Sequence, residues 1–248
     1  MQTADRYIVA LDKELVNQLR RQSLWLRDSW LWLLREKGIS GSALDLGCGP
    51  GLVMEALGGR LDITGLDSDP DMVAMCRAKG LTAVEGIAGS LPFGDSSFDV
   101  VYCSFLLLWV KEPAQVVREM ARVSRRFVVC LAEPDYGARI NHPAQVERLN
   151  DMLCEGIRAK GGDPQVGRKL RTVFKRAGVE AQIGAHAGVW DVETMRREME
   201  GEWRFIEGTA AFGSDAERLE LKRIWEESVE QGEMLLYNPF FYAVGEKR

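Results

Sequence analysis

Residues that commonly build metal sites and disulfide frameworks are scarce in this chain of 248 residues, which has two histidines and five cysteines. No two cysteines form a CxxC pair, and neither histidine lies at ligand spacing from a cysteine, so no metal site is predicted. Scattered thiols are typical of a reducing compartment. We therefore expect a cytoplasmic protein without a metal centre.

Long apolar runs and an excess of basic residues are also absent. The most apolar stretch, residues 24–34, is too short to span a bilayer and contains Arg27 and Asp28. The chain has 32 basic and 37 acidic residues and a net charge of −5, so it has no general attraction to nucleic acid or anionic membranes. We expect neither a membrane span nor a nucleic-acid partner.

The composition that remains is that of a folded globular protein, with 46% apolar and 28% charged residues. The length supports one domain with additions, so residues 1–248 are predicted to form a single domain. Residues 7–37 carry apolar side chains at three- and four-residue steps, which predicts a helix at the N-terminus.

Short apolar runs then alternate with helical patterns. Strands are predicted at residues 43–46, 63–66, 81–84, 100–103 and 127–131, and helices between them at 52–57, 72–78 and 116–123. This alternation is typical of an α/β fold, in which helices cover both faces of a parallel sheet.

The order of elements changes in the second half of the chain. A helix is predicted to open at Asp163-Pro164 and to end near Gly178, followed by a strand at residues 179–189. Helices are predicted at 192–199 and 216–230, and a last strand at 239–244. Because a long helical insertion precedes this last strand, we expect it to be antiparallel in a mostly parallel sheet. Segments 140–178 and 191–236 are predicted to be helical additions.

A glycine-rich turn follows the first predicted strand, in the sequence Asp45-Leu46-Gly47-Cys48-Gly49-Pro50-Gly51. The carboxyl ends of the strands line the ligand crevice of an open α/β sheet, and glycine lets a ligand approach the backbone closely. A tight strand-to-helix turn without a ligand is the alternative explanation.

An acid, Asp67, ends the next strand, at about the separation from the glycines that suits a bound ribose. A solvated strand end is the alternative. The third glycine of a dinucleotide site is missing, because Leu52 and Met54 stand at the two candidate positions. Asp45 favours a ligand that brings a positive charge, such as S-adenosylmethionine.

On these residues the chain resembles the class I S-adenosylmethionine-dependent methyltransferases, in particular the small-molecule branch of the ubiquinone and menaquinone pathways. Residues 45–51 are similar to the first motif of that family and Asp67 to its ribose acid. Residues 84–93 and 98–104 resemble the motifs of the third and fourth strands. The resemblance implies a Rossmann-like, doubly wound sheet, with residues 1–40 as a helical lid and residues 41–136 as the cofactor-binding core.

The resemblance also implies which residues contact the cofactor S-adenosylmethionine: Asp45, Gly47, Cys48, Gly49, Asp67, Ser68, Ile87, Ala88 and Cys103. Gly47 and Gly49 would border its methionine part, and Ile87 and Ala88 its adenine. Ile87 departs from the family, which commonly has an acid at this position.

The acceptor side of the site is less defined by the sequence, and no catalytic residue is assigned. Asp135 and Tyr136 follow the fifth strand and are candidate acceptor contacts, although a simple turn would explain them equally well. Tyr237 is a further candidate, and the two histidines are interpreted as structural. Tryptophans in the lid and in the additions favour a small-molecule acceptor with apolar or aromatic character.

The predicted function is methyl transfer to a small molecule by in-line displacement, with proximity and orientation as the main catalytic effects. The alternative is a non-catalytic module that binds S-adenosylmethionine or a partner with the same fold. Ile87 and the lack of an evident general base motivate that alternative. Methylation of nucleic acid is disfavoured by the acidic composition.

Overall fold

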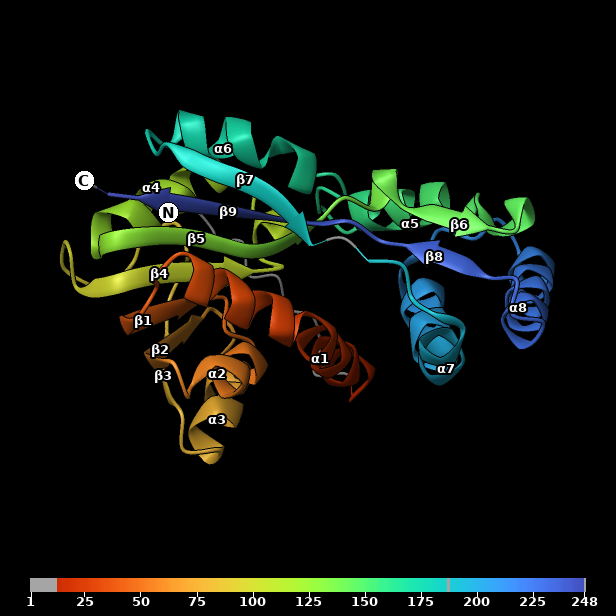
Figure 1. The fold of residues 1–248 in the computed structure, drawn as a ribbon, viewed down its shortest axis with the longest axis horizontal. Coiled ribbons are helices and arrows are strands. Elements are labelled where there is room, and N and C mark those ends of the chain that lie inside the picture. Colours follow the sequence, from red (N-terminus) through yellow and green to blue (C-terminus); the bar gives the residue numbers. More distant parts are fainter. Residues whose placement is uncertain (1–12, 187, 248) are drawn as a thin grey trace.

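A seven-stranded sheet forms the centre of the computed structural model, which describes residues 13–186 and 188–247 (Figure 1). In their order across the sheet, the strands are β3 (Thr82–Glu85), β2 (Leu61–Asp67), β1 (Gly41–Leu46), β4 (Phe98–Ser104), β5 (Ser124–Pro134), β9 (Phe240–Glu246) and β7 (Ala181–His186). The first five of these strands pair in parallel, whereas β9 is antiparallel to both β5 and β7. The prediction of a mostly parallel sheet with an antiparallel last strand is confirmed.

Helices cover both faces of this sheet, as expected for a doubly wound fold (Figure 1). They are α1 (Lys13–Glu36), α2 (Leu52–Leu57), α3 (Pro70–Ala78), α4 (Pro113–Val123) and α6 (Leu170–Arg176). Successive strand residues point to opposite faces. In β4, Val100 and Tyr102 therefore join a core with α1 and α2, while Val101 and Cys103 join a core with α4 and α6.

Helix α1 is the described part of the helix predicted at residues 7–37, since residues 7–12 lie outside the described residues. Its C-terminal half buries Leu26, Trp30 and Leu33 against one face of the sheet. The sequence did not indicate this packing, because a pattern of apolar residues does not say which part of a sheet the helix covers. Only the N-terminal half of α1 extends toward the carboxyl ends of the strands (Figure 1).

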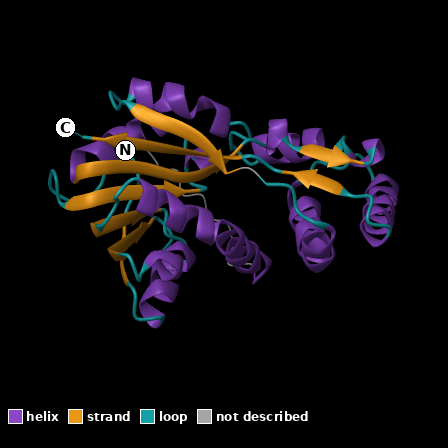
Figure 2. Ribbon diagram, viewed as in Figure 1, coloured by secondary structure: helices purple, strands orange, loops and turns teal. Residues whose placement is uncertain are grey.

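The additions form a second, smaller group of elements beyond the carboxyl ends of β4 and β5 (Figure 2). They comprise α5 (Leu149–Ala159), α7 (Val192–Thr209), α8 (Asp215–Glu230) and the antiparallel pair of β6 (Ile140–His142) and β8 (Leu235–Tyr237). A separate apolar core, which includes Trp203, Trp225 and Leu236, lies within this group. By contrast, α6 packs on the sheet, although it falls within the segment 140–178 predicted as an addition.

Some predicted boundaries were wrong. The helix expected to open at Asp163-Pro164 begins only at Leu170 with α6, after a single 3-10 turn, η4 (Gly167–Lys169). The Asp163 carboxylate accepts the Gln165 backbone N–H (3.1 Å), so this acid closes a local turn and does not cap a long helix. Helix α5 lies within the segment 140–178 that was predicted to be helical but had no predicted bounds, and the short strands β6 and β8 were not predicted.

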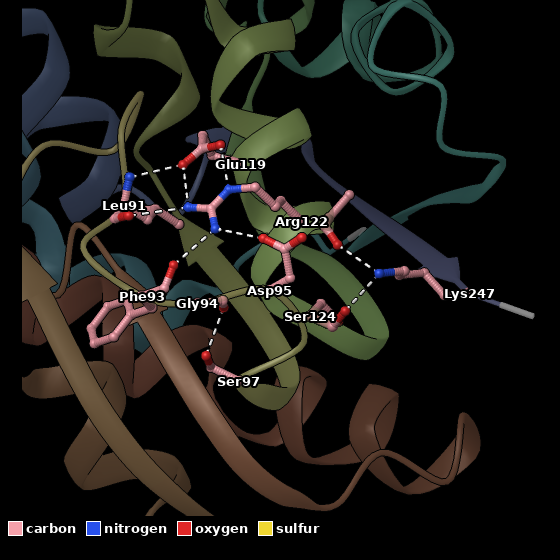
Figure 3. A network of polar contacts seen from close by, with 10 residues as sticks. Leu91, Phe93, Gly94, Asp95, Ser97, Glu119, Arg122, Ser124 and Lys247 are labelled. Atoms are coloured by element: carbon pink, nitrogen blue, oxygen red, sulfur yellow. Dashed lines mark hydrogen bonds and ion pairs between the residues drawn. The ribbon is translucent and has the colours of Figure 1, made fainter.

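The connection between β3 and β4 is held by a polar network near the start of β5 (Figure 3). Arg122, in the last turn of α4, donates to the carbonyls of Leu91 (3.1 Å) and Phe93 (2.8 Å) and pairs with Asp95 (2.9 Å). The Lys247 ammonium donates to the Ser124 carbonyl (2.7 Å). Arg122 thus satisfies backbone carbonyls of a loop that contains no helix or named strand.

Among the described helices, none combines the length and apolar character needed to cross a bilayer.

Candidate functional site

The glycine-rich turn joins β1 to α2 at the carboxyl edge of the sheet. Gly47, Gly49 and Gly51 all have positive φ angles, of 72°, 51° and 82°. The backbone N–H groups of Gly47 and Cys48 donate to the Leu66 carbonyl (2.8 and 3.1 Å) and tie the turn to β2. The φ of 72° at Gly47 favours glycine, and a Cβ there would also lie 2.9 Å from Leu106 Cδ1.

Asp67, at the end of β2, holds this turn in place. Its Oδ2 accepts the Gly49 backbone N–H (2.8 Å) and its Oδ1 accepts the Asp69 backbone N–H (3.0 Å). Burial raises the pKa of Asp67, and these N–H groups oppose the shift. Ser68 follows at the same edge and is half-buried. A carboxylate oxygen has two lone pairs, so Asp67 can still accept hydroxyl groups from a ligand.

Asp45 lies on β1 with only 1% of its surface exposed. Within the described part of the chain, its buried Oδ2 accepts no well-aligned hydrogen bond, although the Tyr102 hydroxyl interacts with this carboxylate. Burial raises the pKa of Asp45 well above its ordinary value, and the Tyr102 hydroxyl on β4 partly opposes this shift. A buried carboxylate oxygen without a partner is costly unless a ligand satisfies it. A cationic or N–H-donating ligand group fits this position.

Cys48 faces away from the ligand side of the turn. Its Sγ lies 3.9 Å from Cys76 Sγ, and a Cβ on Gly65 would lie 2.7 Å from it, so the thiol packs between the turn, β2 and α3. The Cys76 thiol in turn donates to the Gly49 carbonyl (3.2 Å). The Cys48 backbone, not its thiol, is therefore the part that borders the crevice.

The remaining predicted contacts lie on the neighbouring strand ends. Ile87 and Ala88 follow β3, where Ile87 is 53% exposed and Ala88 is half-buried. Cys103 is paired in register with Leu46 of β1, and its thiol is fully buried beside Cys130. The nine predicted site residues therefore come together along the carboxyl edge of β1, β2, β3 and β4.

Comparison with known proteins identifies this part of the chain. Residues 44–130, from β1 into β5, match the methyltransferase domain family. By this match, residues 44–130 carry a methyltransferase domain. The match covers the glycine turn, Asp67 and the ends of the next strands.

Curated relatives match the same region. The chain is 39% identical over 94 residues to the phosphatidylethanolamine N-methyltransferase of Cereibacter sphaeroides. This alignment covers 35% of this chain and 46% of that protein. It is 33% identical over 129 residues to the demethylmenaquinone methyltransferase of Shouchella clausii. This second alignment covers 47% of this chain and 54% of that protein. The chain thus matches about half the length of these relatives.

Solved structures share the fold at low identity. A Haemonchus contortus phosphoethanolamine N-methyltransferase 2 in complex with phosphomonomethylethanolamine and S-adenosylhomocysteine aligns with a TM-score of 0.56 and 15% identity over 89% of this chain and 52% of that one. A geranyl diphosphate methyltransferase in complex with S-adenosylmethionine aligns with a TM-score of 0.52 and 13% identity over 90% and 85% of the two chains.

Among the candidate acceptor contacts, Asp135 already has an ion-pair partner within the protein. Its buried carboxylate binds the Arg168 guanidinium, with Nη2 at 2.7 Å from Oδ1. Tyr136 is buried with its ring against Phe205, and Tyr237 is half-buried in β8. Asp135 therefore already has a structural partner, the Arg168 guanidinium.

A buried ionic cluster joins this edge of the sheet to α1 and α7. Glu202 of α7 lies 3.0 Å from Arg139 Nη1 and 3.5 Å from Arg21 Nη2, and Glu198 lies 3.1 Å from Arg21 Nε. Trp25 and Trp190 stack edge to face beside it, with ring centroids 4.5 Å apart. The N-terminal half of α1 is therefore attached to the additions by both charge and aromatic contacts.

Glu133, at the end of β5, is a functional candidate that the sequence did not single out. Glu133 is fully buried and accepts three backbone N–H groups from the segment after β4. Burial raises its pKa to about 8, and those N–H groups oppose the shift. An acid at the end of an otherwise apolar strand was the available signal.

Two surface hollows of the described residues lie away from this edge. One adjoins β7 and β9 near Lys37 and Arg171, and the other lies between the start of α4 and α6. Neither includes a residue of the glycine turn. Neither is a candidate for the cofactor site, because ligands of an open α/β sheet bind at the carboxyl edge of its strands.

Proposed function

We propose that this protein transfers a methyl group from S-adenosylmethionine to a small-molecule acceptor. The observation that supports this most is the glycine turn flanked by Asp45 and Asp67, with one Asp45 oxygen buried and unpaired among the described residues. Phosphate-containing dinucleotides fit such a carboxylate poorly, because it would repel them. A ligand with an ammonium group, a sulfonium and a ribose fits it well.

Different residues would hold the methionine part, the ribose and the adenine of the cofactor. Asp45 would accept the ammonium group, and the backbone at Gly47 and Gly49 would line the methionine part. Asp67 would accept the ribose hydroxyls, with Ser68 beside it.

For the adenine, Ile87 and Ala88 would supply apolar contact and a backbone N–H. Cys103 would contribute strand backbone only, because its thiol is buried in the core with α4.

When bound, S-adenosylmethionine supplies an electrophilic methyl group on sulfur. The chain contributes binding, orientation and exclusion of water, and alignment of two reactants in one site removes a large part of the barrier. The N-terminal half of α1 would act as the lid, because Leu19 approaches the turn (its Cδ1 would lie 3.8 Å from a Cβ on Gly49) and Arg21 binds the additions.

We further propose that the acceptor has an apolar or aromatic part. Phe105 and Phe240 pack edge to face at the carboxyl ends of β4 and β5, with ring centroids 5.3 Å apart. Trp25 and Trp190 lie between α1 and the additions. Such rings offer apolar area with defined geometry. Five unpaired cysteines support a reducing compartment, the cytoplasm, as the location.

Isothermal titration with S-adenosylhomocysteine tests the cofactor assignment. Asp67→Ala removes charge-assisted hydrogen bonds worth about 1.5–3 kcal/mol, so we expect the dissociation constant to rise roughly 10- to 150-fold. Asp62→Ala, an exposed acid on the same strand, serves as the control and should bind like the parent.

Absence of binding by the parent at millimolar S-adenosylhomocysteine would contradict the proposal. Activity is tested separately, by transfer of a labelled methyl group to a panel of small aromatic and apolar acceptors. Binding without transfer to any of them would instead support the non-catalytic module considered from the sequence.

A further inference from the structure

A single buried carboxylate organises the segment that follows β4. Glu133 Oε1 accepts the backbone N–H groups of Leu106 (2.9 Å) and Leu107 (2.7 Å), and Oε2 accepts that of Leu108 (3.2 Å). These three donors are consecutive in the chain and open the 3-10 turn η1 (Leu107–Trp109). Glu133 therefore fixes the path of the backbone as it leaves the carboxyl end of β4.

The residue just before this turn is strained. Phe105 has a φ angle of +54°, a left-handed conformation that non-glycine residues rarely adopt. Such strain persists only where the surroundings hold it, and it is common at functional sites. Here the Phe105 N–H donates to the Ala132 carbonyl (2.8 Å), and Glu133 holds the next three N–H groups.

The strained turn carries the Leu106 side chain back over the glycine turn. Leu106 Cδ1 lies 2.9 Å, and Cδ2 3.4 Å, from where a Cβ on Gly47 would be. Gly47 is the residue proposed to border the methionine part of the cofactor. Leu106 is only half-buried, so part of its surface faces outward at this edge.

We infer that Glu133 is a positioning residue for the part of the site that would hold the methyl donor. Its carboxylate holds the strained turn at residues 105–108, so that the Leu106 side chain forms a wall over Gly47. This inference rests on the proposed function, because it takes the space beside Gly47 as the place of the methionine part. Glu133 itself does not reach the ligand.

A metal site is the competing explanation for Glu133. Ligand atoms of Cys103, Cys130 and Glu133 lie within 4.8 Å of one another. However, both Glu133 oxygens already accept backbone N–H groups. The geometry therefore favours a positioning role.

A double-mutant cycle on the affinity for S-adenosylhomocysteine tests this inference. Glu133→Gln places an amide NH2, which cannot accept, where one of the two oxygens accepts a backbone N–H, and we expect the dissociation constant to rise about tenfold. Leu106→Ala removes the wall and should raise it about fivefold. If Glu133 acts by placing Leu106, the double variant should be no weaker than Glu133→Gln, because coupled residues are not additive.

Asp99→Asn is the matched control. Asp99 also accepts a backbone N–H, that of Ser42 (2.9 Å), but at the opposite end of β1 and β4. It should lower the thermal midpoint and leave the dissociation constant within twofold of the parent.

Additive effects in the cycle, or tighter binding by Leu106→Ala, would overturn the inference. Leu106→Ala changes a half-buried side chain, so it tests the wall even if Glu133→Gln fails to fold. Failure of the parent to bind would instead count against the proposed function and is seen before any variant is measured.

Discussion

Asp45 bears the cost of a buried carboxylate, since among the described residues its Oδ2 has no hydrogen-bond partner. Nearby, Asp67 has a similar burial problem but satisfies both of its oxygens with backbone N–H groups of Gly49 and Asp69. The Gly49 N–H of the glycine turn is thus held by Asp67. At the residue scale, Asp45 keeps an oxygen without a backbone partner, whereas Asp67 has only its remaining lone pairs to offer a ligand.

This difference predicts a trade-off for Asp45→Asn. Replacing a buried carboxyl, whose ionised form burial destabilises, with a neutral amide of similar shape should raise the free energy of unfolding at pH 7 by about 1 kcal/mol. The same change should weaken binding of S-adenosylhomocysteine roughly 10- to 150-fold, because the ammonium group loses its charged partner. Urea unfolding and titration of parent and variant measure the two effects.

The pH dependence follows from the direction of the pKa shift of Asp45. Burial raises that pKa, so the folded state holds a proton that the unfolded state releases, and the contribution of Asp45 to stability falls as the pH rises above about 4. The stability gain of Asp45→Asn should therefore be larger at pH 8 than at pH 4. An equal gain at both values would contradict the buried-charge explanation.

Helix α1 serves two purposes along its length. Leu26, Trp30 and Leu33 bury its C-terminal half on the sheet, whereas the N-terminal half carries buried polar residues, among them Gln18 and Gln22. The N-terminal half of α1 extends beyond the apolar face of the sheet, so it buries less apolar area than the C-terminal half. Its contacts with α7 compensate for part of that loss.

Gly201 of α7 offers a specific way to loosen this contact. A Cβ at this position would lie 2.0 Å from Arg21 Nη1, so Gly201→Ala must displace the guanidinium from Glu198 and Glu202. Losing these partly buried ion pairs costs about 1 kcal/mol, so amide exchange in residues 16–25 should become about fivefold faster.

Gly208→Ala, in the same helix, is the control. Nothing lies within 4 Å of a Cβ at Gly208, so this change should only stabilise α7, by about 0.5–1 kcal/mol. Unchanged exchange in α1 for Gly201→Ala would show that Arg21 does not hold the lid.

At the scale of the whole molecule, α5 packs into the sheet core shared with α4 and α6, whereas α7, α8 and β8 surround an apolar core of their own. Both faces of the sheet bury their own clusters, and the additions bury a further one around Trp203 and Trp225. Phe205 packs against both the addition core and the core shared with α4 and α6. The proposed donor site therefore depends on a core to which α5 contributes, and not on the core around Trp203 and Trp225.

This arrangement predicts that damage to the additions spares the cofactor site. Trp225 is fully buried, so Trp225→Ala should lower the free energy of unfolding by about 3–5 kcal/mol. Binding of S-adenosylhomocysteine at 20 °C should stay within about twofold, since no predicted site residue belongs to that core. Urea unfolding followed by circular dichroism, with titration alongside, measures both.

Trp32→Ala gives the matched control, because Trp32 is 43% exposed on α1 and its removal should change stability by less than about 1 kcal/mol. A large loss of cofactor affinity in Trp225→Ala would mean that the additions shape the donor site directly.

Much of the sheet could be predicted because its signals are local. The strand before the glycine turn, helix α2 at residues 52–57 and the antiparallel last strand follow from periodicity, glycine spacing and the order of elements. The glycines themselves mark positions of positive φ, a property that each residue carries alone. The sequence therefore determined the fold class and the edge of the sheet where the candidate site lies.

The partners of buried polar groups were decided only by the tertiary structure. Glu133 meets Leu106 and its neighbours across 25 to 27 residues, and Asp67 meets Gly49 across 18. Periodicity shows that a side chain is buried but not which donor it will find, because that depends on how strands far apart in sequence are placed side by side. For the same reason, only the packed structure shows Asp45 as the unpaired carboxylate and Leu106 over Gly47.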